Sequence, residues 1–129
     1  MTVVLDASVV VSLWLDPEAS VRLKDRLRGE TFHAPEHLLV EVANVLRRQR
    51  NAGLLEQRTA AEAFSGVLEM PVRLWPFSVI AERAWGLGAN ASSYDAAYLA
   101  LAEHLDAPLF TRDTRLSRVP GLHCSIELV

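Results

Sequence analysis

Short apolar runs alternate with amphipathic segments along the whole chain, and this alternation restricts the fold more than any other feature of the sequence. Five runs have the length and composition of buried strands. They span residues 2–5, 31–34, 72–75, 108–111 and 122–128. Strands that are separated by helices favour a parallel sheet with helices on both of its faces. The sequence therefore predicts an α/β fold.

Helical segments fill the intervals between the runs. Asp16-Pro17-Glu18 combines a capping residue, a proline at the first helical position and an acid in the first turn, so it predicts a helix start. Gly29 is typical of a helix end, and Ser8 is an acceptable cap for an earlier helix. An apolar stripe predicts a helix over residues 38–46, with Gly53 after it.

Three further helices are expected in the second half of the chain. They cover residues 56–69, residues 78–87 and a segment that Ser92 or Ser93 caps. The last of these helices carries one apolar face, made of Tyr94, Ala97, Tyr98, Leu101 and Leu105.

Length and composition favour one intracellular domain. The chain has 129 residues, of which half are hydrophobic, so we expect a single domain over residues 1–129 with one core. No apolar run is long enough to span a membrane, and no signal peptide is recognisable, so we expect a cytoplasmic protein without membrane attachment. Cys124 is the only cysteine, which excludes an internal disulfide and cysteine-based zinc binding.

Four acidic residues are expected at or beside the edge of the sheet where α/β proteins bind their ligands. Asp6 ends the first run and Asp113 follows the fourth, and ligands bind beyond the carboxyl ends of such strands. Glu41 borders a buried helix stripe, and Asp95 lies in the first turn of its helix. Each acid alone is explained as well by helix capping, by helix-dipole electrostatics or, for Glu41, by an ion pair with Arg48.

Taken together, the four acids indicate a metal site. Clustered carboxylates repel one another unless a cation neutralises them. Mg²⁺ or Mn²⁺ suits such a site, because these hard ions prefer oxygen ligands. An ion bound there activates water and stabilises the displacement at a phosphodiester, so no covalent nucleophile is needed.

Four ordered motifs resemble the PIN-domain family, and within it the VapC-type toxins. The motifs are Val-Leu-Asp6-Ala-Ser8, Glu41-Val-Ala-Asn44-Val-Leu-Arg47-Arg48, Ser92-Ser-Tyr94-Asp95-Ala-Ala-Tyr98 and Leu109-Phe-Thr111-Arg-Asp113. The resemblance covers essentially the whole chain. It implies a three-layer α/β/α sandwich around a small, mostly parallel sheet. It also implies Mg²⁺-dependent cleavage of RNA by a toxin of a toxin–antitoxin pair.

The resemblance assigns roles to individual residues. Asp6, Glu41, Asp95 and Asp113 match the acidic quartet of the family, with direct and water-mediated metal contacts left open. Ser8 and Thr111 match small hydroxyl positions near the quartet, where they would orient a carboxylate or a metal-bound water. The alternative is that Ser8 is only a helix cap and Thr111 only a strand-end residue. Asn44 lies one turn after Glu41 and is expected to support the Glu41 side chain. The alternative is that Asn44 is an ordinary polar surface residue.

Contacts with RNA are predicted for a few arginines. The net charge of −3 is unusual for a nucleic-acid binder, but without the four site acids the balance is 13 basic to 12 acidic residues. Arg112 and Arg115 neighbour Asp113, and Arg48 belongs to a second basic cluster. Binding through these side chains weakens with salt, although most exposed arginines are simply solvated.

The resemblance further implies two protein partners. One is a cognate VapB-type antitoxin, whose basic segment enters the acidic cleft, and the other is a second copy in a homodimer. The apolar residues Leu54, Leu55, Trp75 and Trp85 belong to the core or to such an interface, and we expect core positions for the tryptophans.

Other functions were weighed against this one. A haloacid-dehalogenase-like phosphatase needs a second aspartate at the position of Ser8, and no glycine-rich dinucleotide motif follows the first run. The four histidines have no metalloprotease spacing. The alternative from another class is a catalytically silent PIN-like module that binds RNA or a protein. DNA cleavage also stays open, because recognition of the 2′-hydroxyl depends on contacts that the sequence does not place.

Overall fold

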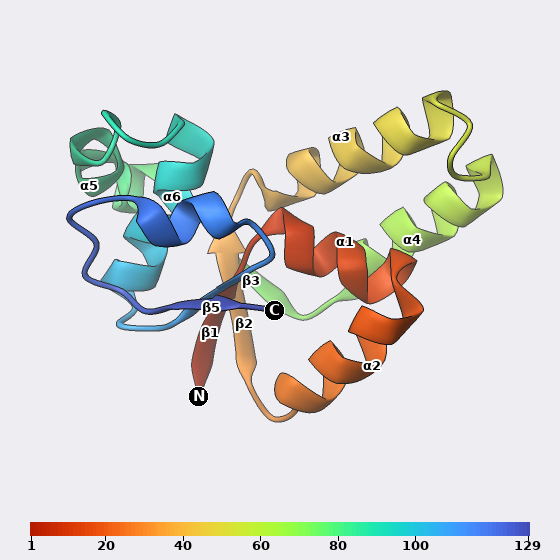
Figure 1. Ribbon diagram of the computed structural model, residues 1–129, viewed down its shortest axis with the longest axis horizontal. Helices are drawn as coiled ribbons and strands as arrows, with labels where there is room; N and C mark the ends of the chain where they lie inside the picture. The colour runs from red at the N-terminus through yellow and green to blue at the C-terminus, as the bar shows by residue number, and fades with distance from the viewer.

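Five parallel strands form the central sheet in the order β3–β2–β1–β4–β5 (Figure 1). The computed structural model describes residues 1–129. The strands are β1 (Thr2–Leu5), β2 (Thr31–Pro35), β3 (Val72–Trp75), β4 (Leu109–Thr111) and β5 (Ile126–Leu128). All five strand predictions are confirmed, with bounds shifted by a few residues and a shorter last strand.

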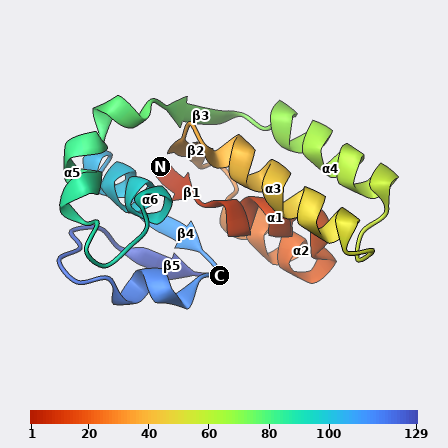
Figure 2. The same ribbon diagram turned by 90° about the horizontal axis from the view of Figure 1, so that it is seen from above.

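Helices cover both faces of this sheet, which confirms the three-layer α/β/α prediction. They are α1 (Ala7–Leu15), α2 (Pro17–Arg26), α3 (Leu38–Asn51), α4 (Gln57–Glu69), η1 (Phe77–Val79), α5 (Ala81–Gly86), α6 (Ser93–His104) and η2 (Thr114–Arg118). Figure 2 shows α5 and α6 on one side of the sheet and α1 to α4 on the other. The chain therefore winds from β1 to β3 over one face and returns to β4 over the other.

Helix starts follow the capping residues, with one correction. The carboxylate of Asp16 accepts from the backbone N–H of Ala19, and Ser92 caps α6, as expected. Helix α1 begins at Ala7, before the predicted cap at Ser8. The reason is that Asp6 itself is the N-cap and accepts from the N–H of Val9.

The helix predicted over residues 78–87 is two shorter elements. Ile80, which is 3% exposed, separates η1 from α5 with φ −117° and ψ 5°. This backbone conformation lies outside the α-helical region, and it turns the Ile80 side chain into the core.

Helix α6 is buried on nearly all sides rather than along one stripe. Every residue from Ala96 to Ala102 is buried, and four of these seven are alanines. Small side chains allow the helix to pack closely against the sheet on one side and α5 on the other. Tyr94, which the sequence assigned to the apolar face, is 63% exposed at the start of the helix.

The tryptophans do not all enter the core, so that expectation is wrong in part. Trp75 is half-buried at the end of β3, where its Nε1–H donates to Nδ1 of His33. Trp85 is 87% exposed, because its neighbour Ala84 occupies the buried side of the short helix α5. Leu54 is also exposed, whereas Leu55 packs against the core.

None of the helices is long and apolar enough to cross a membrane.

Helices α1 and α4 approach closely at a glycine. A Cβ atom built on Gly66 would lie 2.2 Å from the far edge of the Trp14 indole. The absence of a side chain at Gly66 therefore allows the half-exposed Trp14 ring to lie against α4.

We expect Gly66→Ala to lower the free energy of unfolding. Overpacking of this kind costs about 1–3 kcal/mol, which outweighs the helix propensity that alanine adds, about 1 kcal/mol. Urea unfolding measures the change. Gly86→Ala is the matched control, because nothing lies within 4 Å of its added Cβ. In a Trp14→Ala background the same Gly66→Ala change should stabilise the protein, and a loss of stability there would contradict this explanation.

Candidate active site

Strands β1 and β4 bring the first two acids to one edge of the sheet. The two strands are neighbours, and Leu5 pairs with Phe110 in their register. Asp6 therefore lies opposite Thr111, the last residue of β4, and Asp113 follows two residues later. At this edge the chain order of the strands reverses, which is where open α/β sheets bind their ligands.

Two hydroxyl groups hold the carboxylate of Asp6. Ser8 donates to Oδ1 and Thr111 donates to Oδ2, each at 2.5 Å. Each hydroxyl oxygen also accepts a backbone N–H, Ser8 from Arg112 and Thr111 from Asp113. We call this arrangement of Asp6, Ser8 and Thr111 the hydroxyl clasp. The interpretation of Ser8 and Thr111 as residues that orient a carboxylate matches this geometry.

Helix α3 supplies the third acid, Glu41. Its Oε1 accepts a hydrogen bond of 2.7 Å from the hydroxyl of Tyr98 on α6. The ring of His37 lies beside it, with Nε2 3.1 Å from the same oxygen. No ion pair joins Glu41 to Arg48, the alternative partner that the sequence left open, because Glu41 turns toward α6 while Arg48 is exposed.

Asp95 and Asp113 complete the acidic group. Asp95 lies in the first turn of α6, which Ser92 caps. Asp113 caps η2, and Arg115 donates to both of its carboxylate oxygens through Nε and Nη2. This ion pair holds the pKa of Asp113 below its ordinary value.

The acids interact electrostatically. Burial raises the pKa of Asp6, against its hydrogen bonds from Ser8 and Thr111, and the charge of Glu41 adds to the increase. Burial also raises the pKa of Asp95, with smaller contributions in the same direction from Asp113 and Glu41. These mutual effects place the four carboxylates in one neighbourhood of excess negative charge.

A divalent ion suits the chemistry of this group. All of its donors are carboxylate or hydroxyl oxygens, which hard cations prefer. In the structure no three acidic or histidine side chains converge closely enough to hold an ion. Two of the acids also make contacts outside the group, Glu41 with Tyr98 and Asp113 with Arg115.

The remaining predicted residues fall into two groups. Arg112 and Arg115 lie beside the acids, but Arg112 is bound to Ser12 at 2.7 Å and to Asp16 at 3.1 Å. Asn44 lines a surface groove between α3 and α4 and makes no hydrogen bond to Glu41. Arg48 is exposed on the same helix.

Sequence reasoning missed the residues that support the acids. The sequence places Tyr98 on an apolar helix face and in a family motif, and it gives His37 no role beside the acids. A signal was present, since a buried tyrosine usually finds a partner for its hydroxyl and Tyr98 follows Asp95 by one helical turn. Ser12 gave no signal, because its partner Arg112 is 100 residues away in the chain.

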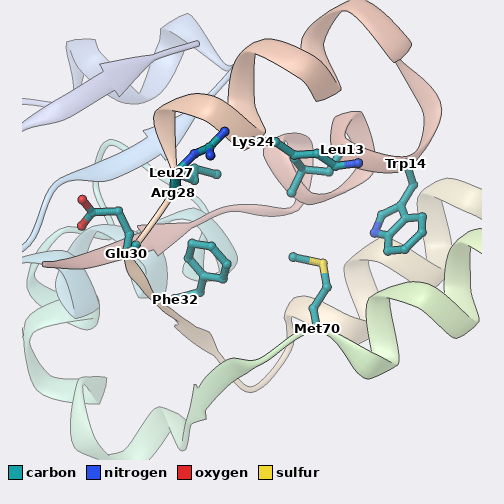
Figure 3. Close-up of a pocket in the computed structure, with 9 residues that line it drawn as sticks. Leu13, Trp14, Lys24, Leu27, Arg28, Glu30, Phe32 and Met70 are labelled. Atoms are coloured by element: carbon teal, nitrogen blue, oxygen red, sulfur yellow. The ribbon is translucent and has the colours of Figure 1, made fainter.

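A separate apolar cavity lies away from the acids. It has a volume of about 340 Å³ and is formed by α1, α2, the loop that leads into β2, the start of β2 and the end of α4. Figure 3 shows Phe32 and Met70 at its centre, with Trp14 on one side and Glu30 near its margin. None of the predicted site residues lines it.

Known proteins with similar sequences point to one family. A family model described as PIN domain matches residues 3–122. Ribonuclease VapC12 of Mycobacterium tuberculosis is 41% identical over 127 residues, which cover 98% of both chains. Ribonuclease VapC1 of the same organism is 37% identical over 128 residues, covering 98% of this chain and 96% of the relative.

Solved structures share the fold. Mycobacterium tuberculosis VapC20, described as a sarcin-ricin loop cleaving toxin, has a TM-score of 0.69 at 19% identity and covers 93% of this chain and 95% of its own. VapBC2 from Rickettsia felis, bound to a DNA fragment from its promoter, has a TM-score of 0.66 at 14% identity, covering 99% and 98%.

We expect Asp6→Asn and Asp113→Asn to change stability in opposite directions at pH 7. The raised pKa of Asp6 means that the folded state binds its proton more tightly, so stability falls as pH rises from the ordinary value of 3.8 through the raised folded value. Asp6→Asn removes this cost and raises the melting temperature. The lowered pKa of Asp113 stabilises the fold above 3.8, and this is lost as pH falls through the folded value, so Asp113→Asn lowers the melting temperature.

Thermal unfolding in EDTA, at pH 7 and again near pH 3, measures both effects. Each difference from the wild type should shrink as the pH falls below 3.8, because the carboxyl groups of the unfolded chain bind protons there. Shifts of the same sign for both variants at pH 7 would contradict the electrostatic assignment.

Proposed function

The chain belongs to the PIN domain family, and we propose that it is a VapC-type endoribonuclease toxin that hydrolyses RNA phosphodiester bonds with Mg²⁺, or with Mn²⁺ as a substitute. The observation that carries the proposal is the arrangement of the four acids at the carboxyl edge of the sheet. Asp6 and Asp113 follow the neighbouring strands β1 and β4, and Tyr98 ties Glu41 to α6, whose first turn holds Asp95. The names of the relatives support ribonuclease activity, and the oxygen donors support a hard divalent ion.

In this proposal the four acids are the groups that hold the metal. The hydroxyl clasp fixes both carboxylate oxygens of Asp6. A bound divalent ion activates water and neutralises charge on the phosphodiester. Glu41 is hydrogen-bonded to Tyr98, and Asp113 is hydrogen-bonded to Arg115. Whether each carboxylate contacts the metal directly or through water depends on whether it keeps that hydrogen bond.

RNA binding is assigned mainly to Arg115. Its side chain is 78% exposed beside Asp113, so it can reach a phosphate oxygen next to the carboxylates. Arg112 contributes less, because its side chain is only 35% exposed and is bound to Ser12 and Asp16, away from the acids. Arg48 on α3 is exposed and forms no ion pair, so we assign it as a second phosphate contact. Binding through these charges falls as salt rises.

A VapB-type antitoxin and a second copy of the chain are the proposed protein partners, in the cytoplasm. The structure from Rickettsia felis is described as VapBC2, and a Klebsiella pneumoniae structure with a TM-score of 0.59 is described as a toxin–antitoxin complex. A basic antitoxin segment suits the excess negative charge around Asp6 and Asp95. A silent PIN-like binding module is the alternative, and the complete acidic quartet argues against it.

We expect the purified, antitoxin-free chain to cut total bacterial RNA into discrete fragments with Mg²⁺ or Mn²⁺ and to leave it intact in EDTA. Asp95→Asn should lower the cleavage rate by about 100-fold or more, because a carboxylate that would hold the metal is lost, and with it the charge that the metal supplies to the reacting phosphate. Gel analysis of the fragments against time gives both rates.

Asp25→Asn is the matched control, because this substitution makes the same change of charge at a position away from the site. Asp25 lies on α2, where its side chain is 83% exposed. Circular dichroism checks that each variant is folded. The absence of cleavage by the wild type, or equal rates for wild type and Asp95→Asn, would overturn the proposal and favour the binding module.

A further inference from the structure

Tyr98 joins the two helices that flank the acidic group. Its side chain is 1% exposed, and its hydroxyl donates to Oε1 of Glu41, 57 residues earlier in the chain. Burial, together with the charges of Glu41, Asp6 and Asp95, raises the pKa of Tyr98 far above its ordinary value. The phenol therefore keeps its proton and acts as a donor.

The hydroxyl of Tyr98 is the only hydrogen-bond donor to the Glu41 side chain. His37 lies within 3.1 Å of Oε1, but its Nε2 has no hydrogen-bond partner. The His37 ring instead supports Tyr98 through an edge contact, with the ring centroids 5.2 Å apart. The second oxygen of Glu41, Oε2, receives no hydrogen bond and is free for another ligand.

We propose that Tyr98 is a positioning residue that holds Glu41 beside Asp6 and Asp95 through its hydroxyl, so that Oε2 faces the incoming metal. The inference rests on the proposed function and adds a residue to it. Glu41 has three rotatable side-chain bonds and is repelled by the neighbouring acids, so without a donor it would turn toward solvent. Donors behind a metal ligand orient it in this way, and their loss commonly weakens metal binding or activity 10–100-fold.

A purely structural role for Tyr98 predicts something different. The phenyl ring fills the core against the sheet, and Tyr98→Phe keeps that ring while it removes the hydroxyl. If only the ring matters, the variant behaves as wild type. If the hydroxyl positions Glu41, the variant keeps its fold and loses metal affinity, and this loss depends on the presence of Glu41.

Calorimetric titration with Mn²⁺ and single-turnover RNA cleavage test the proposal. Tyr98→Phe should bind Mn²⁺ about 10–100-fold more weakly and should need correspondingly more metal for half-maximal cleavage. Tyr94→Phe is the matched control, because Tyr94 is 63% exposed on the same helix and its hydroxyl makes no hydrogen bond. It should bind Mn²⁺ as the wild type does, and melting temperatures check that both variants are folded.

A double-mutant cycle gives the second comparison. In a Glu41→Gln background, Tyr98→Phe should add no further loss of Mn²⁺ affinity. Wild-type affinity in Tyr98→Phe, or a full additional loss in the Glu41→Gln background, would overturn the role of Tyr98 while leaving the proposed function intact. A wild type that neither binds Mn²⁺ nor cleaves RNA would overturn the proposed function and this inference together.

Discussion

A buried carboxylate at the end of the central strand is the interaction on which the rest of the site depends. Asp6 is 7% exposed, and an ionised group in that position is costly unless hydrogen bonds compensate. The hydroxyl clasp supplies two of these bonds, and the first N–H groups of α1 supply another. The same clasp binds the backbone after β4, so the support of one charge also fixes the loop that carries Asp113.

Much of this arrangement could be predicted from the sequence because local rules decide it. Buried strands and capping residues predicted where the elements begin, and the Asp16-Pro17 start was confirmed. The positions of Asp6 and Asp113 followed from topology, since parallel strands present their carboxyl ends at one edge. Where local rules competed, the prediction failed: Ser8 and Asp6 are both good caps, and only the structure shows that Asp6 caps α1.

The partners of the site acids could not be predicted because they depend on tertiary contacts. Glu41 had a plausible partner on its own helix in Arg48, but α6 brings Tyr98 close enough to take its place. Exposure is hard to predict for the same reason. The exposed Trp85 and Tyr94 have large apolar rings that a sequence pattern places inside, whereas the alanines around them complete the close packing of α5 and α6.

The hydroxyl clasp also determines when, during synthesis, the acidic edge of the sheet can assemble. Thr111, which closes the clasp, lies 105 residues after Asp6, so it is synthesised long after the carboxylate that it holds. Strand β4 must pair with β1 before the carboxylate is enclosed. A nascent chain therefore lacks its finished acidic edge until β4 has emerged, and a truncated translation product that stops before β4 cannot assemble it.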